Sequence, residues 1–225
     1  QSDPQAKALL DKVVTFLGGA DKVKTVKALH QFSNGEQVTP QGTVALENES
    51  YTVLPDQSHS IAKSAALPGV LHIVIGPQGA WMSIEGQGMQ AMPASMKQDR
   101  LNNLHRSPIA IAQHASDLVV TAGDKSADAP TIHISGNGVD VQWAIDPASG
   151  KLLRSTFTAS GQQGPVLRTI EYSDWKQVEG VNLPFKAVIL EGGKQVGMDQ
   201  AKSVEINPKI DPKLFDKPNE ATAPQ

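Results

Sequence analysis

The sequence predicts a mainly β protein with some α-helix, built on one curved antiparallel sheet. Short runs of alternating apolar and polar residues recur along the chain, and turn dipeptides rich in Gly, Asn and Pro separate them. Apolar residues at helical spacing are confined to the N-terminus and one central segment. We count about nine to eleven strands, and an open twisted sheet of roughly that size curls or closes. We therefore expect a barrel or a half-barrel.

The first element is an amphipathic helix. Asp3 followed by Pro4 is a favourable N-cap and first-turn pair. Apolar residues then recur at helical spacing over residues 6–17, until a Gly-Gly pair ends the pattern. Residues 20–26 predict a second, short helical turn before the first strand.

Strands begin after this turn. Alternation from Ala28 to Phe32 leads to the Asn34-Gly35 dipeptide, which is typical of a turn. The clearest later strand segments are residues 43–53, 58–63, 70–75, 80–85 and 139–145. Because turn signals between strands are closely spaced, we expect the strands to follow one another as a meander.

A helical insertion near residues 93–115 interrupts the strand pattern. Pro93 can start a helix in which Met96, Leu101 and Leu104 lie near one face. Pro108 ends this helix before a short apolar helix. The sheet therefore resumes only after the insertion.

The sequence predicts a single domain over residues 1–218. Turn-separated strands occur before and after the insertion, and no Pro-, Gly- or Ser-rich linker divides them. Residues 219–225 contain Pro, Ala, Glu and Thr without periodicity, so we expect a disordered tail.

Composition excludes several classes of partner. The net charge of −3 and the scattered Lys and Arg residues argue against a nucleic-acid partner. No apolar run approaches the roughly 20 residues that span a bilayer, so we expect a soluble chain that is not membrane-spanning. The absence of cysteine excludes disulfides, thiolate metal sites and thiol nucleophiles. The chain begins at Gln1 without Met, which favours export after removal of a signal peptide.

No catalytic, metal or cofactor motif is present in the sequence. None of the six histidines belongs to a helical zinc-protease motif, and His72 and His133 are interpreted as satisfied or surface residues. His105 and His114 in the helical insertion are only weak candidates. Residues 86–91 match a loose dinucleotide fingerprint, but that motif requires parallel βαβ surroundings, so we interpret them as a flexible loop. We therefore predict no cofactor, no metal and no enzymatic activity, and rank an enzyme of unrecognised type last.

Methionine clusters in one segment. Four of the five methionines lie close together in the strand, loop and helix around residues 82–96, beside a tryptophan. Flexible thioethers suit the mouth of a hydrophobic cavity, but they also fill irregular gaps under a helix that closes a barrel. Both interpretations stay open. The candidate ligand-binding residues are Trp81, Met82, Met89, Met92 and Met96.

Two stretches near the C-terminus carry a family resemblance. Residues 172–186 read YSDWKQVEGVNLPFK, with an aromatic-Asp strand and a Gly-Val-x-Leu-Pro turn. Residues 204–215 read VEINPKIDPKLF. These motifs, together with an opening helix that ends in Gly-Gly, resemble the LolA/LolB-like superfamily of outer-membrane lipoprotein-sorting-like proteins.

The resemblance implies a strongly curved antiparallel half-barrel whose concave apolar face is closed by helices. It also implies the periplasm of a Gram-negative bacterium and a non-enzymatic protein that binds a lipid-like or acylated ligand, possibly a lipoprotein. The alternative is a protein-interaction or accessory domain of an envelope assembly or of a peptidase-like multidomain protein, with no bound lipid.

Overall fold

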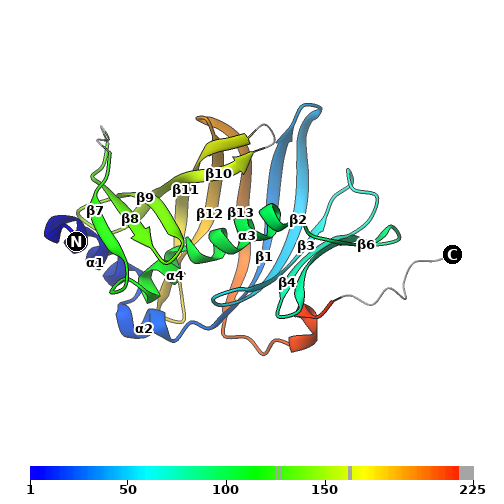
Figure 1. Cartoon of the computed structure of the whole chain (residues 1–225), viewed down its shortest axis with the longest axis horizontal. Helices are drawn as coiled ribbons and strands as arrows, with labels where there is room; N and C mark the ends of the chain where they lie inside the picture. The colour runs from blue at the N-terminus through cyan, green and yellow to red at the C-terminus, as the bar shows by residue number, and fades with distance from the viewer. Residues whose placement is uncertain (125, 127, 162–163, 218–225) are drawn as a thin grey trace.

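The computed structural model describes residues 1–124, 126, 128–161 and 164–217, which form one curved antiparallel sheet with a few helices (Figure 1). The predicted tail at 219–225 lies outside the described residues. The helices are α1 Pro4–Leu17, α2 Ala20–Lys24, α3 Ala94–His105, α4 Pro108–Gln113 and the 3-10 helix η1 Pro212–Phe215. The strands of the first half are β1 Ala28–Thr39, β2 Gly42–Val53, β3 Gln57–Lys63, β4 Leu71–Gly76, β5 Gly79–Ile84 and β6 Gly88–Ala91. Those of the second half are β7 Val119–Ala122, β8 Thr131–Gly136, β9 Val139–Ile145, β10 Leu152–Gly161, β11 Gly164–Val178, β12 Val181–Glu191 and β13 Lys194–Ile206.

Two meanders make the sheet. The strand order is β6-β5-β4-β3-β2-β1-β13-β12-β11-β10-β9-β8-β7, so every neighbour follows in sequence except β1 and β13. The described residues give thirteen strands, more than the nine to eleven expected from sequence. The edge strands β6 and β7 have four residues each, too few to show an alternation pattern. The prediction of a flexible loop over residues 86–91 is therefore wrong for most of this segment, because β6 begins at Gly88.

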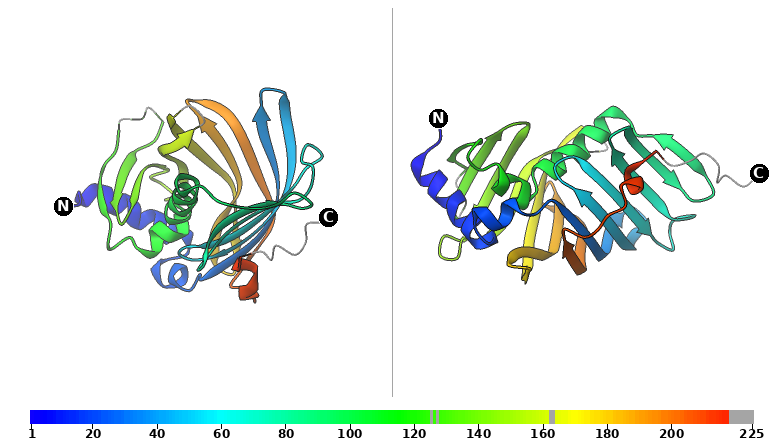
Figure 2. Two further views of the ribbon diagram at one scale, coloured as in Figure 1. Left: turned by 45° about the vertical axis from the view of Figure 1, so that its right-hand side comes forward. Right: turned by 90° about the horizontal axis from the view of Figure 1, so that it is seen from below.

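The sheet is a half-barrel that does not close. Figure 2 shows it curving around α3, so that one face is concave and carries the helices. Because β6 and β7 are the two opposite edges, the chain between them must cross the molecule, and α3 and α4 make that crossing on the concave side. The predicted helical segment therefore spans the mouth of the half-barrel.

The helix α1 has the N-cap, the apolar spacing and the terminating glycine that the sequence predicts. Asp3 Oδ1 accepts hydrogen bonds from the backbone N–H groups of Gln5 at 2.7 Å and Ala6 at 3.1 Å. Its buried residues repeat at the expected helical spacing and are Ala6, Leu10, Val13, Val14 and Leu17. Gly18 ends the helix with a φ of 126°, which side chains rarely adopt.

The main hydrophobic core lies in the second half of the sheet. There α1 packs against β7, β8 and β12, and α2 packs against α4. The largest side chain in this core, Trp143 of β9, is fully buried together with Ile132, Ile134 and Leu152. These helices therefore cover the concave side of this half.

The C-terminal segment closes the convex side. Asn207 accepts hydrogen bonds from the backbone N–H groups of Lys27 at 2.7 Å and Ala28 at 3.1 Å, and it donates one to Thr25 O at 2.8 Å. Further along, η1 packs against β3 and β4 and buries Phe215. The closing motif of the sequence therefore fastens the chain end to the start of β1 and to the outer face.

The end of α1 docks on the β11–β12 turn. A Cβ at Gly18 would lie 2.5 Å from the carbonyl oxygen of Gly180. Asn182 Nδ2, next to this turn, donates a hydrogen bond to Phe16 O at 2.6 Å. The opening Gly-Gly and the Gly-Val-x-Leu-Pro turn, far apart in sequence, are therefore in contact.

We predict that Gly18→Ala destabilises the fold more than Gly42→Ala. Both glycines have a φ near 125°, at 126° and 124°, but a Cβ at Gly42 meets no atom within 4 Å. Gly42→Ala should therefore cost only the backbone strain, about 1–3 kcal/mol. Gly18→Ala should add at least ~1 kcal/mol, because α1 must move off the turn. Urea denaturation of both variants measures the difference, and equal losses would contradict this docking contact.

Candidate functional site

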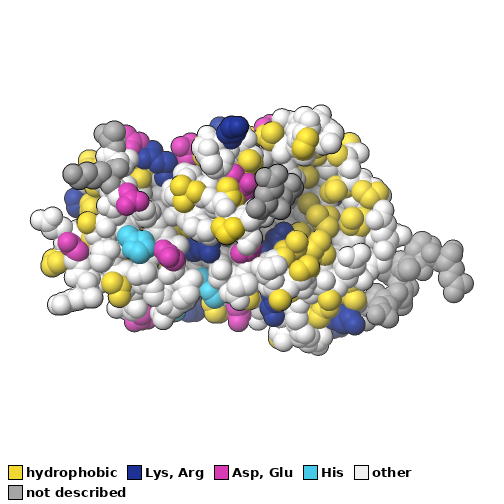
Figure 3. Space-filling model, turned by 45° about the horizontal axis from the view of Figure 1, so that its top comes forward, with side chains coloured by type: hydrophobic (Ala, Val, Ile, Leu, Met, Phe, Trp, Pro, Cys, Tyr) yellow, Lys and Arg dark blue, Asp and Glu magenta, His cyan; other side chains and the backbone are white. Residues whose placement is uncertain are grey.

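The concave face of the first half of the sheet holds a second, smaller apolar cluster. Ile73 of β4 lies directly opposite Met82 of β5, and these two side chains and Leu101 of α3 pack against a small buried cluster. Figure 3 shows hydrophobic side chains gathered in a hollow on this right-hand half of the molecule. We call this hollow the α3 groove and define it by Ile73, Ile75, Ala80, Met82, Met92 and Leu101.

The α3 groove is thinly covered. No residue of α3 is buried, in contrast to α1, which buries five side chains. Ile73, Met82 and Leu101 are accordingly only partly buried, while Ile75, Ala80 and Met92 form the buried floor. Apolar surface that a single polar helix covers incompletely is available to an apolar ligand.

A polar band borders the groove on the same face. Asp199 of β13 accepts hydrogen bonds from Ser33 Oγ at 2.6 Å, Gln31 Nε2 at 3.0 Å and Asn48 Nδ2 at 3.4 Å. The strand register places these side chains on the face of Ile73. The concave face therefore changes from apolar under α3 to polar at the middle of the sheet.

Two arginines of the α3 segment also face inward. The Arg106 guanidinium lies 4.3 Å from the ring centroid of Phe157, a buried residue of β10 on the concave face. Burial lowers the pKa of both Arg100 and Arg106 below the usual value. The Nε atoms of both are buried without a hydrogen-bond partner. These residues were not recognised from sequence, because Phe157 comes from a distant segment and no local motif links it to α3.

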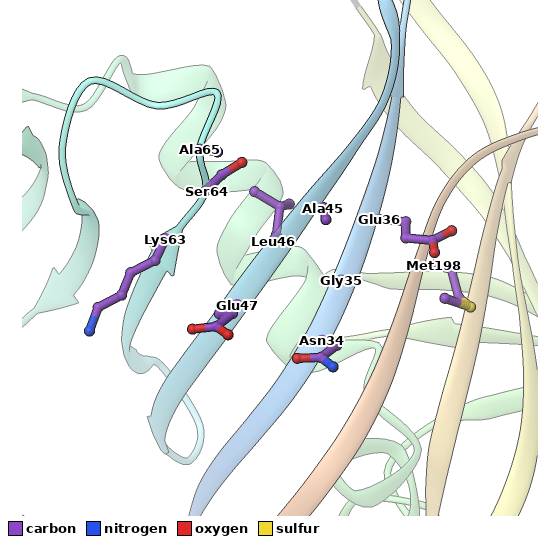
Figure 4. Close-up of a pocket in the computed structure, with 10 residues that line it drawn as sticks. All are labelled: Asn34, Gly35, Glu36, Ala45, Leu46, Glu47, Lys63, Ser64, Ala65 and Met198. Carbon is purple, nitrogen blue, oxygen red and sulfur yellow. The ribbon is translucent and has the colours of Figure 1, made fainter.

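The convex face carries two shallower hollows. One of about 560 Å³ lies where β2 continues past the end of β3, and Figure 4 shows Glu36, Glu47, Lys63 and Met198 around it. A neighbouring hollow of about 290 Å³ shares Glu47 and Lys63 with the first and includes Phe32. Both acidic and basic groups line these hollows, so neither has the apolar character of the α3 groove.

The histidines occupy two regions. His105 and His114 both line an apolar hollow of about 180 Å³ beside α4. On the convex face, His59 Nε2 lies 3.1 Å from His72 Nδ1 on the adjacent strand. His30 stacks on Tyr51 with ring centroids 4.2 Å apart.

Glu49 contacts two ring side chains of the convex face, His30 and Tyr51. His30 Nε2 lies 2.9 Å from Glu49 Oε1, and the Tyr51 hydroxyl donates to the same oxygen at 2.6 Å. That hydrogen bond raises the pKa of Tyr51 to about 12. Burial raises the pKa of Glu49, but the hydrogen bonds from Tyr51 and His30 outweigh burial and lower it overall. His30, Glu49 and Tyr51 therefore form a hydrogen-bonded polar network.

Neither a metal centre nor a membrane helix emerges from the described part of the chain. In residues 1–124, 126, 128–161 and 164–217, no three His, Cys, Asp or Glu side chains group closely enough to hold a metal ion. Within the same residues, no helix has the length and apolar character that crossing a bilayer requires.

The five ligand-binding candidates predicted from the sequence do not lie together in the structure. Met82 and Met92 lie together in the α3 groove. Trp81 is buried on the convex face opposite Val74, and Met89 lies opposite Ser83 on that same face. Met96 on α3 is 39% exposed, so it does not share the inward face of Leu101 as expected.

Solved structures provide the comparison for this architecture. No protein-family model matches the sequence, and no curated protein matches it. A DUF1329 family protein from Desulfovibrio piger superimposes with a TM-score of 0.62 at 11% identity, over 96% of this chain and 98% of that one. A LolA superfamily protein from Nitrosomonas europaea superimposes with a TM-score of 0.61 at 14% identity, over 94% and 97%. The protein has a LolA-like fold.

A third LolA-like structure agrees. A putative outer membrane lipoprotein-sorting protein domain from Vibrio parahaemolyticus superimposes with a TM-score of 0.56 at 7% identity, over 94% of this chain and 96% of that one. The resemblance inferred from the closing motifs is therefore confirmed for the fold. At identities this low, structural similarity shows a shared fold alone. Function must be inferred from the residues of this LolA-like chain.

We predict that stability falls below pH 6.5 through His59. Burial and the neighbouring His72 lower the pKa of folded His59 from 6.5, although Glu49 and the Leu214 backbone oppose this shift. The unfolded chain therefore binds the proton more readily, so the stabilisation is complete above pH 6.5 and is lost as the pH falls towards the lowered pKa.

Urea denaturation between pH 7.5 and pH 5 measures this dependence. His59→Gln should flatten the profile, because it removes the imidazole whose pKa differs between the folded and unfolded chain. Identical profiles for wild type and His59→Gln would refute the assignment.

Proposed function

We propose that this protein is a non-enzymatic periplasmic binding protein for a lipid-like or acylated ligand, such as the acyl chain of a lipoprotein. The α3 groove holds the ligand. The observation that carries the proposal is the partial burial of Ile73, Met82 and Leu101 beneath a helix that buries none of its own residues.

The energetics of such a groove require no catalytic group. Each methylene that leaves water contributes about 0.8 kcal/mol, so a chain of eight buried methylenes supplies roughly 6 kcal/mol. Part of this is offset by the loss of translational freedom on binding. Methionine suits the lining, since the flexible thioethers of Met82 and Met92 adapt to chains of different length.

The similar structures support the proposal without carrying it. The Vibrio parahaemolyticus domain is described as a lipoprotein-sorting protein domain, and it matches nearly the whole of this chain. The periplasmic location and the lipoprotein ligand are inferred from that likeness. Of the five candidate residues, the proposed site keeps Met82 and Met92, with Met96 of α3 at its border, while Trp81 and Met89 on the convex face lie outside it.

One observation favours a second function, that of a protein-interaction domain. Phe32 is 41% exposed on the convex face and lines the 290 Å³ hollow with Ile61. An exposed aromatic beside a hollow is a feature of protein contact sites. This function needs no lipid, so direct lipid binding discriminates between the two.

We predict that delipidated protein takes up N-phenyl-1-naphthylamine, an uncharged apolar dye, in the α3 groove. Leu101→Asp should weaken dye binding by at least ~10-fold, because it places a charge against apolar surface. Met82→Gln, which keeps the length of the side chain, should weaken it less. Dye fluorescence titrations measure both effects.

Leu167→Asp is the matched control. Leu167 is 59% exposed on the convex face of β11, so its replacement should not change dye binding. Circular dichroism verifies that each variant is folded. If the wild-type protein binds neither the dye nor lipid, the lipid-binding function is contradicted and the protein-interaction function is favoured.

A further inference from the structure

We propose that the ligand of the α3 groove carries an anionic headgroup, a carboxylate or a phosphate, which Arg100 and Arg106 bind. This inference rests on the proposed function and adds the chemical class of the ligand. Its basis is a pair of inward-facing guanidinium groups that have no anionic partner within the described residues.

Arg100 belongs to the face of α3 that lies on the sheet. It precedes Leu101, which packs in the groove, and it is one helical turn before Leu104. Its Nε is buried without a hydrogen bond, and no described carboxylate lies within ion-pair distance. Burial alone lowers its pKa. A guanidinium in this position is desolvated and uncompensated.

Arg106 extends the same positive region to the far end of α3. Its guanidinium rests on the Phe157 ring, and the register places Phe157 directly opposite Arg168. Burial is the largest cause that lowers the pKa of Arg106, Asp99 and Asp140 raise it without forming an ion pair, and the charge of Arg168 lowers it further. Arg106 therefore experiences a second cation from the adjacent strand.

Two acidic groups of the concave face are already engaged. Asp199 accepts hydrogen bonds from Ser33, Gln31 and Asn48. Glu191 is paired with Arg168, whose Nε lies 3.1 Å from Glu191 Oε1. Neither carboxylate serves Arg100 or Arg106, and burying an unpaired cation is costly.

An anionic amphiphile satisfies both parts of the site. Arginine presents a planar fork of N–H donors that matches carboxylate and phosphate oxygens. Because Arg100 and Leu101 are adjacent in α3, one ligand can place its alkyl chain on Leu101 and its anion on Arg100. A neutral lipid would bring no anion to either guanidinium group.

The experiment compares headgroups on one alkyl chain. Palmitate, hexadecyl phosphate and 1-hexadecanol are each used to displace the uncharged dye from wild-type protein. We expect both anions to compete at least ~10-fold better than the alcohol, the gain typical of a charge-assisted hydrogen bond. Inorganic phosphate should not displace the dye, because it lacks the alkyl chain.

The double substitution Arg100→Gln with Arg106→Gln should abolish this preference. Palmitate and hexadecanol then compete equally, while the dye still binds. Arg154→Gln is the matched control, since Arg154 pairs with Asp128 at 2.6 Å outside the groove. It should retain the full preference for the anions.

The outcomes separate the two proposals. Equal competition by palmitate and hexadecanol in the wild type overturns the anionic headgroup and leaves the lipid groove intact. Displacement by inorganic phosphate alone, or an unchanged preference in the double variant, also overturns it. Failure of every alkyl compound to displace the dye would instead contradict the proposed function.

Discussion

The pairing of β1 with β13 is the constraint on which the arrangement depends. Each half of the sheet is a simple meander, and only this antiparallel pairing joins them. It places β6 and β7 at opposite edges, so the chain that connects them must cross the concave side as α3 and α4. Figure 1 shows these two edges at opposite ends of the long axis, with α3 and α4 lying between them. The helix over the groove is thus a consequence of topology.

This constraint divides the concave face into two regions with different uses. In the second half, α1, α2 and α4 fill the space with a conventional core around Trp143. In the first half only α3 is available, and it brings few apolar side chains and Arg100, while Arg106 at its C-terminal end lies on Phe157 of β10. The same segment that closes the half-barrel therefore leaves an amphipathic surface, apolar at Leu101 and cationic at Arg100. A crossing helix without a deep core is also the element that can move at low cost when a ligand enters.

Much of the fold could be predicted from local patterns, because turn dipeptides, strand alternation and the N-cap at Asp3 act over a few residues. The closing motifs also pointed to the correct fold, and the structure explains why, since Asn207 fastens the chain end and Gly180 receives Gly18. The site was less accessible to prediction. Methionine clustering drew attention to the segment that contains Met82 and Met92, but the strand alternation that separates Met82 from its neighbour Trp81 decides which face each one lines. The inward position of the arginines depends on contacts between segments that are distant in sequence, and no local sequence pattern predicts such contacts.

The most direct test of the lipid groove uses the methionines as probes. Protein carrying ¹³C-methyl methionine, with signals assigned by single substitutions, is titrated with palmitate and followed by NMR. The account predicts that the Met82 and Met92 methyl signals shift, while that of Met198 in the convex hollow stays unchanged. A shift of Met198 with Met82 and Met92 unmoved would contradict the account and place the ligand on the opposite face.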